Sequence, residues 1–277
     1  MNSEFGNLTK EMKTLNLILF FVLLFVSSCE REIELNLKTS NSRYVIDGNL
    51  STETGESYVR ITKSLNMDDT IQYPTISGAL VTITDNRQLK TDTLNESNPG
   101  LYVKYGLTGL EGHSYTLNVK IESEVFTAQS TIPYSFKLDS LVQINPAEDY
   151  SMNFPGSEPL TTIQILPIYT NSTHTDKYYQ FVVLKNKTLL NSVVARSELA
   201  SKKHSFPVPF FIEAKKNDIL RIDMQFVDKS VYNYLFGLGQ NLSQFSTTPS
   251  NPSSNISNEA LGLFNAHTSQ KLFITIK

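Results

Sequence analysis

The sequence is poor in the residues that support covalent cross-links and thiol chemistry. It has one cysteine, Cys29, and no tryptophan. A lone cysteine excludes a disulfide within the chain and a site built from several thiolates. Basic and acidic side chains nearly balance, at 24 against 27, so no broad positive field exists to attract a phosphate backbone. We therefore expect a fold stabilised by packing and do not expect nucleic acid as a partner.

Motifs of catalysis and metal binding are also missing. The four histidines show no metal-binding pair at spacing i, i+4 and no fixed acidic partner. The acidic pairs Asp68-Asp69 and Glu148-Asp149 lack the spaced ladder and central glycine of a calcium loop, which favours surface turns. Neither a Gly-rich phosphate loop nor a Gly-x-Ser-x-Gly elbow occurs. These absences predict a protein that is not an enzyme and has no metal and no cofactor.

An apolar run lies near the beginning of the chain. Lys13 precedes it, and it extends from Leu15 to Val26, broken by Asn16. About a dozen residues are too few to cross the hydrocarbon core as a helix, which takes about 20. A basic residue, a short apolar run and small residues at its end are typical of a secretory signal.

The apolar run ends in Val26-Ser27-Ser28-Cys29, which matches the bacterial lipobox. We predict that residues 1–28 are a signal peptide and that the mature chain begins at an acylated Cys29. Several acyl chains on one cysteine hold a protein on a membrane stably, whereas one chain holds it reversibly. A membrane helix with a chance cysteine is the alternative, but Glu30-Arg31-Glu32 is not a basic stop-transfer flank.

Residues 29–42 read as an acylated cysteine followed by a flexible, solvated tether. Glu30 and Glu32 lie directly behind the cysteine. A second interpretation is that these two acids form a signal for export to the cell surface, as in lipoproteins of Bacteroidota.

Residues 43–133 predict an immunoglobulin-like or transthyretin-like β-sandwich. Tyr115, Leu117, Val119 and Ile121 alternate with polar residues, the period of a strand with one buried face. Short runs of this kind are separated by turn residues. The predicted strands are Tyr44 to Leu50, Ser57 to Lys63, Ala79 to Asp85, Leu101 to Tyr105, Tyr115 to Ile121 and Val125 to Ile132.

Residues 134–277 predict a second β-rich domain, so the fold class is all-β with two sandwiches. One helix is expected near Lys229 to Gln244, because Val231, Leu235, Leu238 and Leu242 follow helical spacing. A short helix at Ser197 to Ser201 is a further expectation. The predicted strands are Ser140 to Ile144, Thr161 to Tyr169, Tyr178 to Lys185, Ser205 to Ile212, Ile219 to Val227 and Leu272 to Ile276.

Aromatic side chains cluster near the predicted helix, ahead of a long loop rich in Asn, Ser and Pro. They are either core residues or part of a recognition surface, because Tyr offers contact area and Asn offers hydrogen bonds. The candidate recognition face consists of Tyr232, Tyr234, Asn251 and Asn255.

Several short motifs resemble one family in their order and spacing. They are Cys29-Glu30, Tyr44-Val45-Ile46-Asp47-Gly48, Ser77-Gly78-Ala79-Leu80-Val81-Thr82-Ile83, Pro99-Gly100-Leu101-Tyr102, Leu110-Glu111-Gly112-His113-Ser114-Tyr115-Thr116-Leu117, Thr131-Ile132-Pro133, Asp139-Ser140-Leu141 and the segment from Asn251 to Phe264. Together they resemble the Bacteroidota outer-membrane lipoproteins catalogued as domain of unknown function forty-two forty-nine. Asn258-Glu259 departs from the glycine pair or Asn-Gly more usual there.

The resemblance implies a location and a type of partner more than a chemistry. Such proteins are exported lipoproteins, often encoded beside TonB-dependent outer-membrane receptors, and the family supplies no catalytic residues to carry over. We therefore expect an outer-membrane lipoprotein, anchored through Cys29 and facing the cell exterior, that binds a TonB-dependent transporter. The alternative is a structural or adhesion lipoprotein that binds extracellular glycan or matrix.

Overall fold

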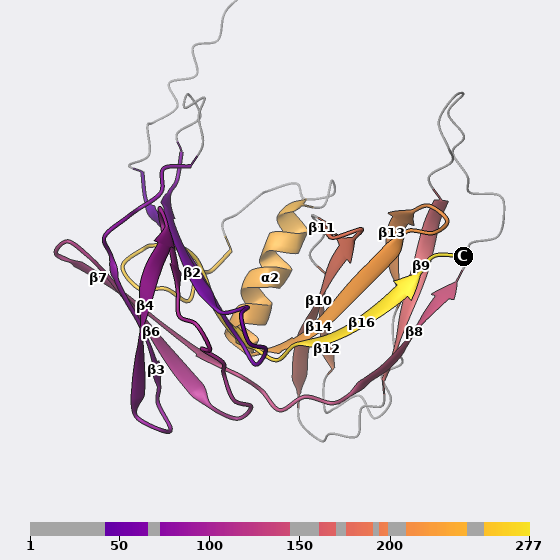
Figure 1. Ribbon diagram of the computed structural model, residues 1–277, viewed down its shortest axis with the longest axis horizontal. Coiled ribbons are helices and arrows are strands. Elements are labelled where there is room, and N and C mark those ends of the chain that lie inside the picture. Colours follow the sequence, from indigo (N-terminus) through magenta and orange to yellow (C-terminus); the bar gives the residue numbers. More distant parts are fainter. Residues whose placement is uncertain are drawn as a thin grey trace, which may run out of the picture. The chain divides into compact units, whose positions relative to one another are not determined.

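The computed structural model describes residues 42–65, 73–144, 161–169, 176–190, 194–198, 209–242 and 252–277 (Figure 1). Over these ranges the fold is mostly β, with one helix, α2 (Lys229–Leu242). The prediction of an all-β protein with a helix near Lys229 is thereby confirmed. The leader, Cys29, Glu30, Glu32 and Asn251 lie outside the described residues.

The first sheet has eight strands in the order β15-β1-β2-β5-β4-β3-β6-β7. Neighbours pair antiparallel except β15 and β1, which are parallel. Alternation explains the core: Ile46 and Leu50 of β1 point inward and are fully buried. The strands are β1 (Tyr44–Ser51), β2 (Tyr58–Lys63), β3 (Leu80–Asp85), β4 (Lys90–Asn98), β5 (Leu101–Val103), β6 (Ser114–Ile121), β7 (Glu124–Thr131) and β15 (Leu261–His267).

The two edge strands of this sheet, β15 and β7, contact each other. The segment before β15 joins them, because the Thr127 amide donates to Ser257 Oγ at 2.8 Å and the Ser257 amide donates to the Thr127 carbonyl at 2.8 Å. The Ala266 amide donates to Ser130 Oγ at 3.0 Å. Phe264 of β15 is fully buried among the core residues of this sheet. Strand β15, the last strand of this sheet in sequence, is thus held by β1 on one side and by β7 on the other.

Two smaller sheets pack face to face and share a second core. One has the order β11-β10-β14-β16, with β12 also on β10, and the other has the order β13-β9-β8. Phe181, Phe226, Ile165 and Phe136 meet between them. The strands are β8 (Leu138–Ile144), β9 (Thr161–Tyr169), β10 (Lys177–Lys185), β11 (Thr188–Leu189), β12 (Val194–Glu198), β13 (Phe210–Ala214), β14 (Ile219–Val227) and β16 (Gln270–Thr275).

Helix α2 begins at a capping aspartate. Asp228 Oδ1 accepts from the amides of Ser230 at 2.8 Å and Val231 at 3.0 Å, the geometry of an N-cap. Val231 and Leu235 of the helix form a third core with Val227 and Leu263. Within the described ranges, no helix has the length and apolar character needed to span a bilayer.

Four of the described strands were not predicted from the sequence: β4, β11, β12 and β15. The short helix expected at Ser197 to Ser201 is wrong where the structure describes it, because Ser197 and Glu198 belong to β12 and pair with Tyr178 and Lys177 of β10. The immunoglobulin likeness and the boundary at Pro133 stay predictions. Close contacts unite residues 41–277 in one compact unit, and β15 joins the first sheet although it follows the second in sequence.

Candidate functional site

Strand β14 presents two chemically different faces. Leu220, Ile222, Met224 and Phe226 are buried in the core between the two smaller sheets. The intervening Arg221, Asp223 and Gln225 must therefore point to the other side of the sheet, because side chains alternate along a strand. Because β14 lies between β10 and β16, these polar side chains lie at the centre of that sheet face.

This polar face forms one wall of a cleft of about 660 Å³. The opposite wall consists of Asp47 and Asn49 from β1, Tyr58 from β2, and Leu263 and Asn265 from β15. Helix α2 contributes Tyr234, Leu235 and Leu238. A volume of this size lies within the range of small-molecule sites in proteins. Strands β10 and β11 also contribute, so seven separate elements supply one concave surface.

A chain of hydrogen bonds fixes the polar wall. Gln180 Nε2 donates to Gln225 Oε1 at 2.8 Å, and Gln225 Nε2 donates to Asp223 Oδ2 at 2.8 Å. Ser269 Oγ donates to Asp223 Oδ1 at 2.8 Å. Because Asp223 is 3% exposed and accepts from two neutral donors, its position is set by the fold.

The second carboxylate of the cleft belongs to Glu56, in the turn between β1 and β2. It forms an ion pair with Lys271 of β16, and Ser51 Oγ donates to it at 3.4 Å. This pair joins the first sheet to β16, which belongs to the second sheet. Most of the charge on Glu56 is therefore compensated inside the protein.

The third carboxylate, Asp47, is the most accessible to a ligand. It receives one hydrogen bond from a side chain, from the Tyr58 hydroxyl at 3.2 Å. Its surface is open to water, but the surrounding walls reduce its solvation and raise the pKa of the Asp47 carboxyl, against the effects of Tyr58 and Arg60. Burial, reinforced by the charge of Asp47, also raises the pKa of Tyr58 and that of Tyr234. The charge of Asp47 thus acts on the hydroxyl groups of both Tyr58 and Tyr234.

One buried polar atom in the cleft wall has no partner. Asn265 is 7% exposed, and its Oδ1 receives no hydrogen bond from any described residue. Buried acceptors in native proteins are almost always paired with protein or water. Asn265 Oδ1 is therefore a buried acceptor in the wall of the cleft with unused hydrogen-bonding capacity.

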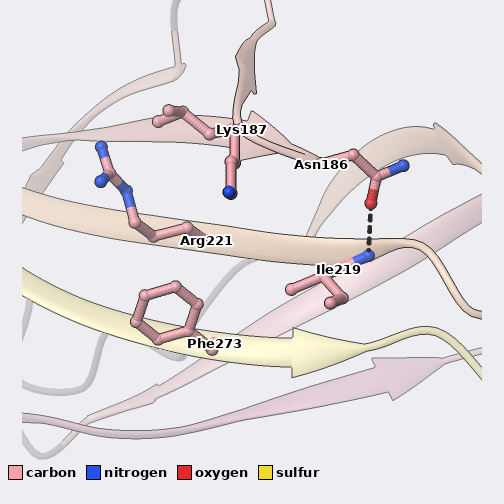
Figure 2. A pocket seen from close by; sticks show the side chains of 6 residues that line it. Asn186, Lys187, Ile219, Arg221 and Phe273 are labelled. Carbon is pink, nitrogen blue, oxygen red and sulfur yellow. Dashed lines mark hydrogen bonds between the residues drawn. The ribbon is translucent and has the colours of Figure 1, made fainter.

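A second pocket of about 660 Å³ continues along the same sheet face beyond Arg221 (Figure 2). Leu184, Arg221 and Phe273 lie side by side across β10, β14 and β16. Phe273 is 68% exposed and Ile219 is 52% exposed. Lys187 and Arg221 extend over the same pocket, and Asn186 Oδ1 accepts from the Ile219 amide at 2.9 Å. This end of the face is apolar with a cationic rim.

The structure places the two tyrosines of the predicted recognition face differently. Tyr234 lines the cleft. Tyr232 instead packs against Tyr178 of β10, with ring centroids 5.0 Å apart, and against Phe236 at 5.8 Å. Tyr232 therefore helps to dock α2 on the sheet, which is the core interpretation of the aromatic cluster.

Asn255 is used inside the fold. Its Oδ1 accepts from the Phe264 amide at 2.9 Å, and its Nδ2 donates to the carbonyls of Phe264 at 2.8 Å and Gln129 at 3.3 Å. These bonds fasten the segment before β15 to β7. Of the predicted face, only Tyr234 is shown to line the cleft, while Asn251 lies outside the described residues.

Sequence reasoning missed Asp47, Asp223 and Asn265. A signal for Asp223 was available, since Arg221, Asp223 and Gln225 alternate along β14 with the apolar residues from Leu220 to Phe226, which are buried. Asp47 and Asn265 gave no comparable signal because their proximity depends on the parallel pairing of β1 with β15. Among the residues that the structure describes, no group of three or more His, Cys, Asp or Glu side chains could hold a metal ion.

Comparison with known proteins identifies the family. A search of curated proteins found no match to this chain. A family model described as "Domain of unknown function (DUF4249)" matches residues 30–272, which is most of the chain and includes every wall of the cleft. The resemblance found in the short motifs is confirmed, and the chain belongs to the DUF4249 family.

Proposed function

We propose that this protein is a lipid-anchored binding protein of the outer membrane, facing the cell exterior, that acts as a non-enzymatic partner of a TonB-dependent transporter. The observation that carries the binding role is the cleft between β1, β14, β15 and α2. The proposed compartment is based on the leader sequence. The proposed transporter partner is based on the motif resemblance, because proteins of that kind are often encoded beside TonB-dependent receptors.

The chemistry of the cleft favours recognition over catalysis. Asp223 and Glu56 are held by hydrogen bonds and an ion pair within the fold. A fixed polar wall beside apolar side chains is typical of a binding site, where a few placed polar groups orient the ligand. A binding protein needs such a preorganised surface and no nucleophile.

The leader supports an anchored location. Acylation at Cys29 would leave residues 30–42 as a tether, which can span at most about 45 Å when fully extended. A tether of that reach allows the folded domains to contact a large membrane protein beside the anchor. Glu30 and Glu32 are the candidate signal that selects the outer surface.

The alternative is an adhesion role, with the exposed aromatic and apolar side chains of the sheet face binding glycan or matrix. Phe273 and Ile219, more than half exposed, favour it. Retention on a glycan array that is lost in Phe273→Ala would support adhesion. Tyr232→Ala is a poor probe, because Tyr232 packs against Tyr178 and its removal would disturb the helix.

Co-purification tests the proposed partnership. The native lipoprotein would be isolated from membranes in mild detergent, and its companions identified by mass spectrometry. A receptor of transporter size should accompany the wild-type chain and should be depleted in Cys29→Ala, which lacks the anchor. Repeated isolation of the lipoprotein without such a receptor would overturn the proposal.

A further inference from the structure

The cleft carries an excess of acceptors and negative charge at one end. Its lining includes three carboxylates, Asp47, Glu56 and Asp223, against one guanidinium, Arg221. Lys271 neutralises Glu56, and Asp223 is bound only by neutral donors. Arg60 lies across from Asp47 on β2 but lines a different pocket. The charge of Arg60 acts on Asp47 from β2, but among the described residues no cation forms an ion pair with this carboxylate.

An unpartnered acceptor lies on the same wall as this carboxylate. Asn49 of β1 pairs with Asn265 of β15, and Asp47 pairs with Leu263, so Asp47 and Asn265 share one face of the parallel pair. Strand spacing puts their Cα atoms roughly 8 Å apart. Asn265 Oδ1 is buried and has no partner among the described residues. A single ligand group with several N–H donors could thus bond to both Asp47 and Asn265.

The surroundings of these acceptors suit an organic cation. Tyr58 and Tyr234 lie near Asp47 and supply aromatic rings, whose faces attract ammonium groups. Leu235, Leu238 and Leu263 supply an adjoining apolar surface. Apolar contact alone would admit any hydrophobic molecule, whereas the carboxylate and the free amide oxygen select one that carries several N–H donors.

We propose that this cleft binds a ligand with an ammonium group on an apolar stem, the ammonium at Asp47 and Asn265 and the stem along Leu235, Leu238 and Leu263. The shared chemistry includes a free alkylamine and the side chain of a lysine in a peptide. A bound cation would also offset the cost of keeping Asp47 charged between the cleft walls, where burial raises its pKa. The proposal concerns the cleft and does not depend on the transporter.

Calorimetric titration of the detergent-solubilised full chain tests this assignment. Hexylamine is the first probe, with hexanol and hexanoate as uncharged and anionic controls of the same stem length. A peptide with blocked termini and one lysine is the second probe, so that the two arms distinguish a free amine from a lysine side chain. Hexylamine or the peptide should bind at least about tenfold more tightly than hexanol, and hexanoate should bind most weakly.

Substitutions connect the binding to the named residues. Asp47→Asn keeps the shape of the side chain and should weaken amine binding about tenfold or more, because a charge-assisted hydrogen bond is lost. Asp139→Asn, at an exposed carboxylate that does not line the cleft, should leave binding unchanged. Thermal unfolding of each variant would verify that it is folded, and Tyr58→Phe offers a second, milder change beside Asp47.

Three results would overturn the proposal. One is equal affinity for hexylamine and hexanol, which would reduce the cleft to a hydrophobic site. Another is unchanged amine affinity in both folded Asp47→Asn and Tyr58→Phe. The third is no binding of either ammonium probe up to about 10 mM, because a site with the described contacts should reach at least millimolar affinity.

Discussion

At the scale of one residue, His267 of β15 is a buried histidine two residues after the cleft residue Asn265. The side chain is fully buried, its Nδ1 lies 3.5 Å from the Asn265 carbonyl, and its Nε2 has no partner among the described residues. Burial lowers the pKa of His267, against the opposing effects of Asp223 and Glu56, while Lys271 lowers it further. His267 is therefore neutral in the folded protein.

We predict that protonation at His267 makes the protein less stable in mild acid. Because the folded pKa lies below the ordinary 6.5, the unfolded chain binds more protons as the pH falls through that value. The contribution of His267 to the free energy of unfolding should be constant above pH 6.5. Below that pH it should make the protein less stable, by at most about 1.4 kcal/mol per pH unit. Urea unfolding at a series of pH values between 7.5 and 5.5 would measure the slope.

His267→Gln should reduce this slope, because glutamine does not titrate. His113→Gln is the matched control, since His113 pairs with Asp85 at a separate site, and it should retain the slope that His267 contributes. An undiminished slope in folded His267→Gln would contradict the assignment.

At the scale of the element, Asp228 connects α2 to the first sheet. One carboxylate oxygen caps the helix, and the other accepts from Ser130 Oγ at 2.6 Å and from the Thr131 amide at 2.9 Å on β7. The position of the helix, and hence of Tyr234 over the cleft, depends on this residue.

Asp228→Ala is predicted to lower the free energy of unfolding by about 2–4 kcal/mol, because it removes both the cap and the bonds to β7. Asp228→Asn keeps part of both functions and should cost about half as much. Chemical denaturation would measure the two variants side by side. A loss in Asp228→Ala no larger than that in Asp228→Asn would show that the carboxylate does not join the elements.

Gly262 allows β15 to pair with β1. It has φ +100°, and an added Cβ would lie 2.1 Å from the Ile46 carbonyl oxygen. We predict that Gly262→Ala lowers the free energy of unfolding by about 2–6 kcal/mol and reduces hydrogen-exchange protection along β1. Gly106→Ala is the control, because Gly106 has φ +74° and an added Cβ would meet no atom within 4 Å. This variant measures the cost of the backbone conformation alone, which should be only about 1–2 kcal/mol. Equal losses in the two variants would mean that the contact with Ile46 has no effect.

Local sequence patterns predicted most strands and the helix, but not the elements that have little apolar signal or depend on distant partners. Strands such as β6 alternate strictly, and α2 follows helical spacing. β4 (KTDTLNESN) buries only Asp92 and Leu94, so it has almost no apolar signal. β15 (LGLFNAH) has five consecutive buried residues, because it lies between β1, β7 and α2, and it was not recognised as a strand.

The candidate site was predictable only in part for the same reason. Tyr234 was found because aromatic residues cluster near the helix. Asp47 and Asn265 come together through a parallel pairing between the beginning and the end of the described chain, which no local pattern encodes. Asn255 was predicted for recognition because of its residue type, but its amide is used to hold Phe264.

At the scale of the whole molecule, the proposed anchor at Cys29 would determine where the cleft operates. Cys29→Ala is predicted to abolish lipidation and to leave the unprocessed precursor, because the sulfur that accepts the lipid is gone. Mass spectrometry and detergent partitioning would measure both effects. Glu30→Ala with Glu32→Ala serves as the control, since it should leave lipidation intact and reduce only the access of protease added outside cells. A mature, membrane-bound Cys29→Ala protein would refute the lipobox.

Cross-linking in intact cells tests the proposed partnership most directly, because the protein stays in its native surroundings and no detergent intervenes. The cross-linked protein would be purified under denaturing conditions and its covalent partners identified by mass spectrometry. The account predicts a TonB-dependent transporter as the principal partner, greatly reduced in Cys29→Ala at equal protein abundance. Efficient cross-linking of the protein to other proteins with no transporter among them would contradict it.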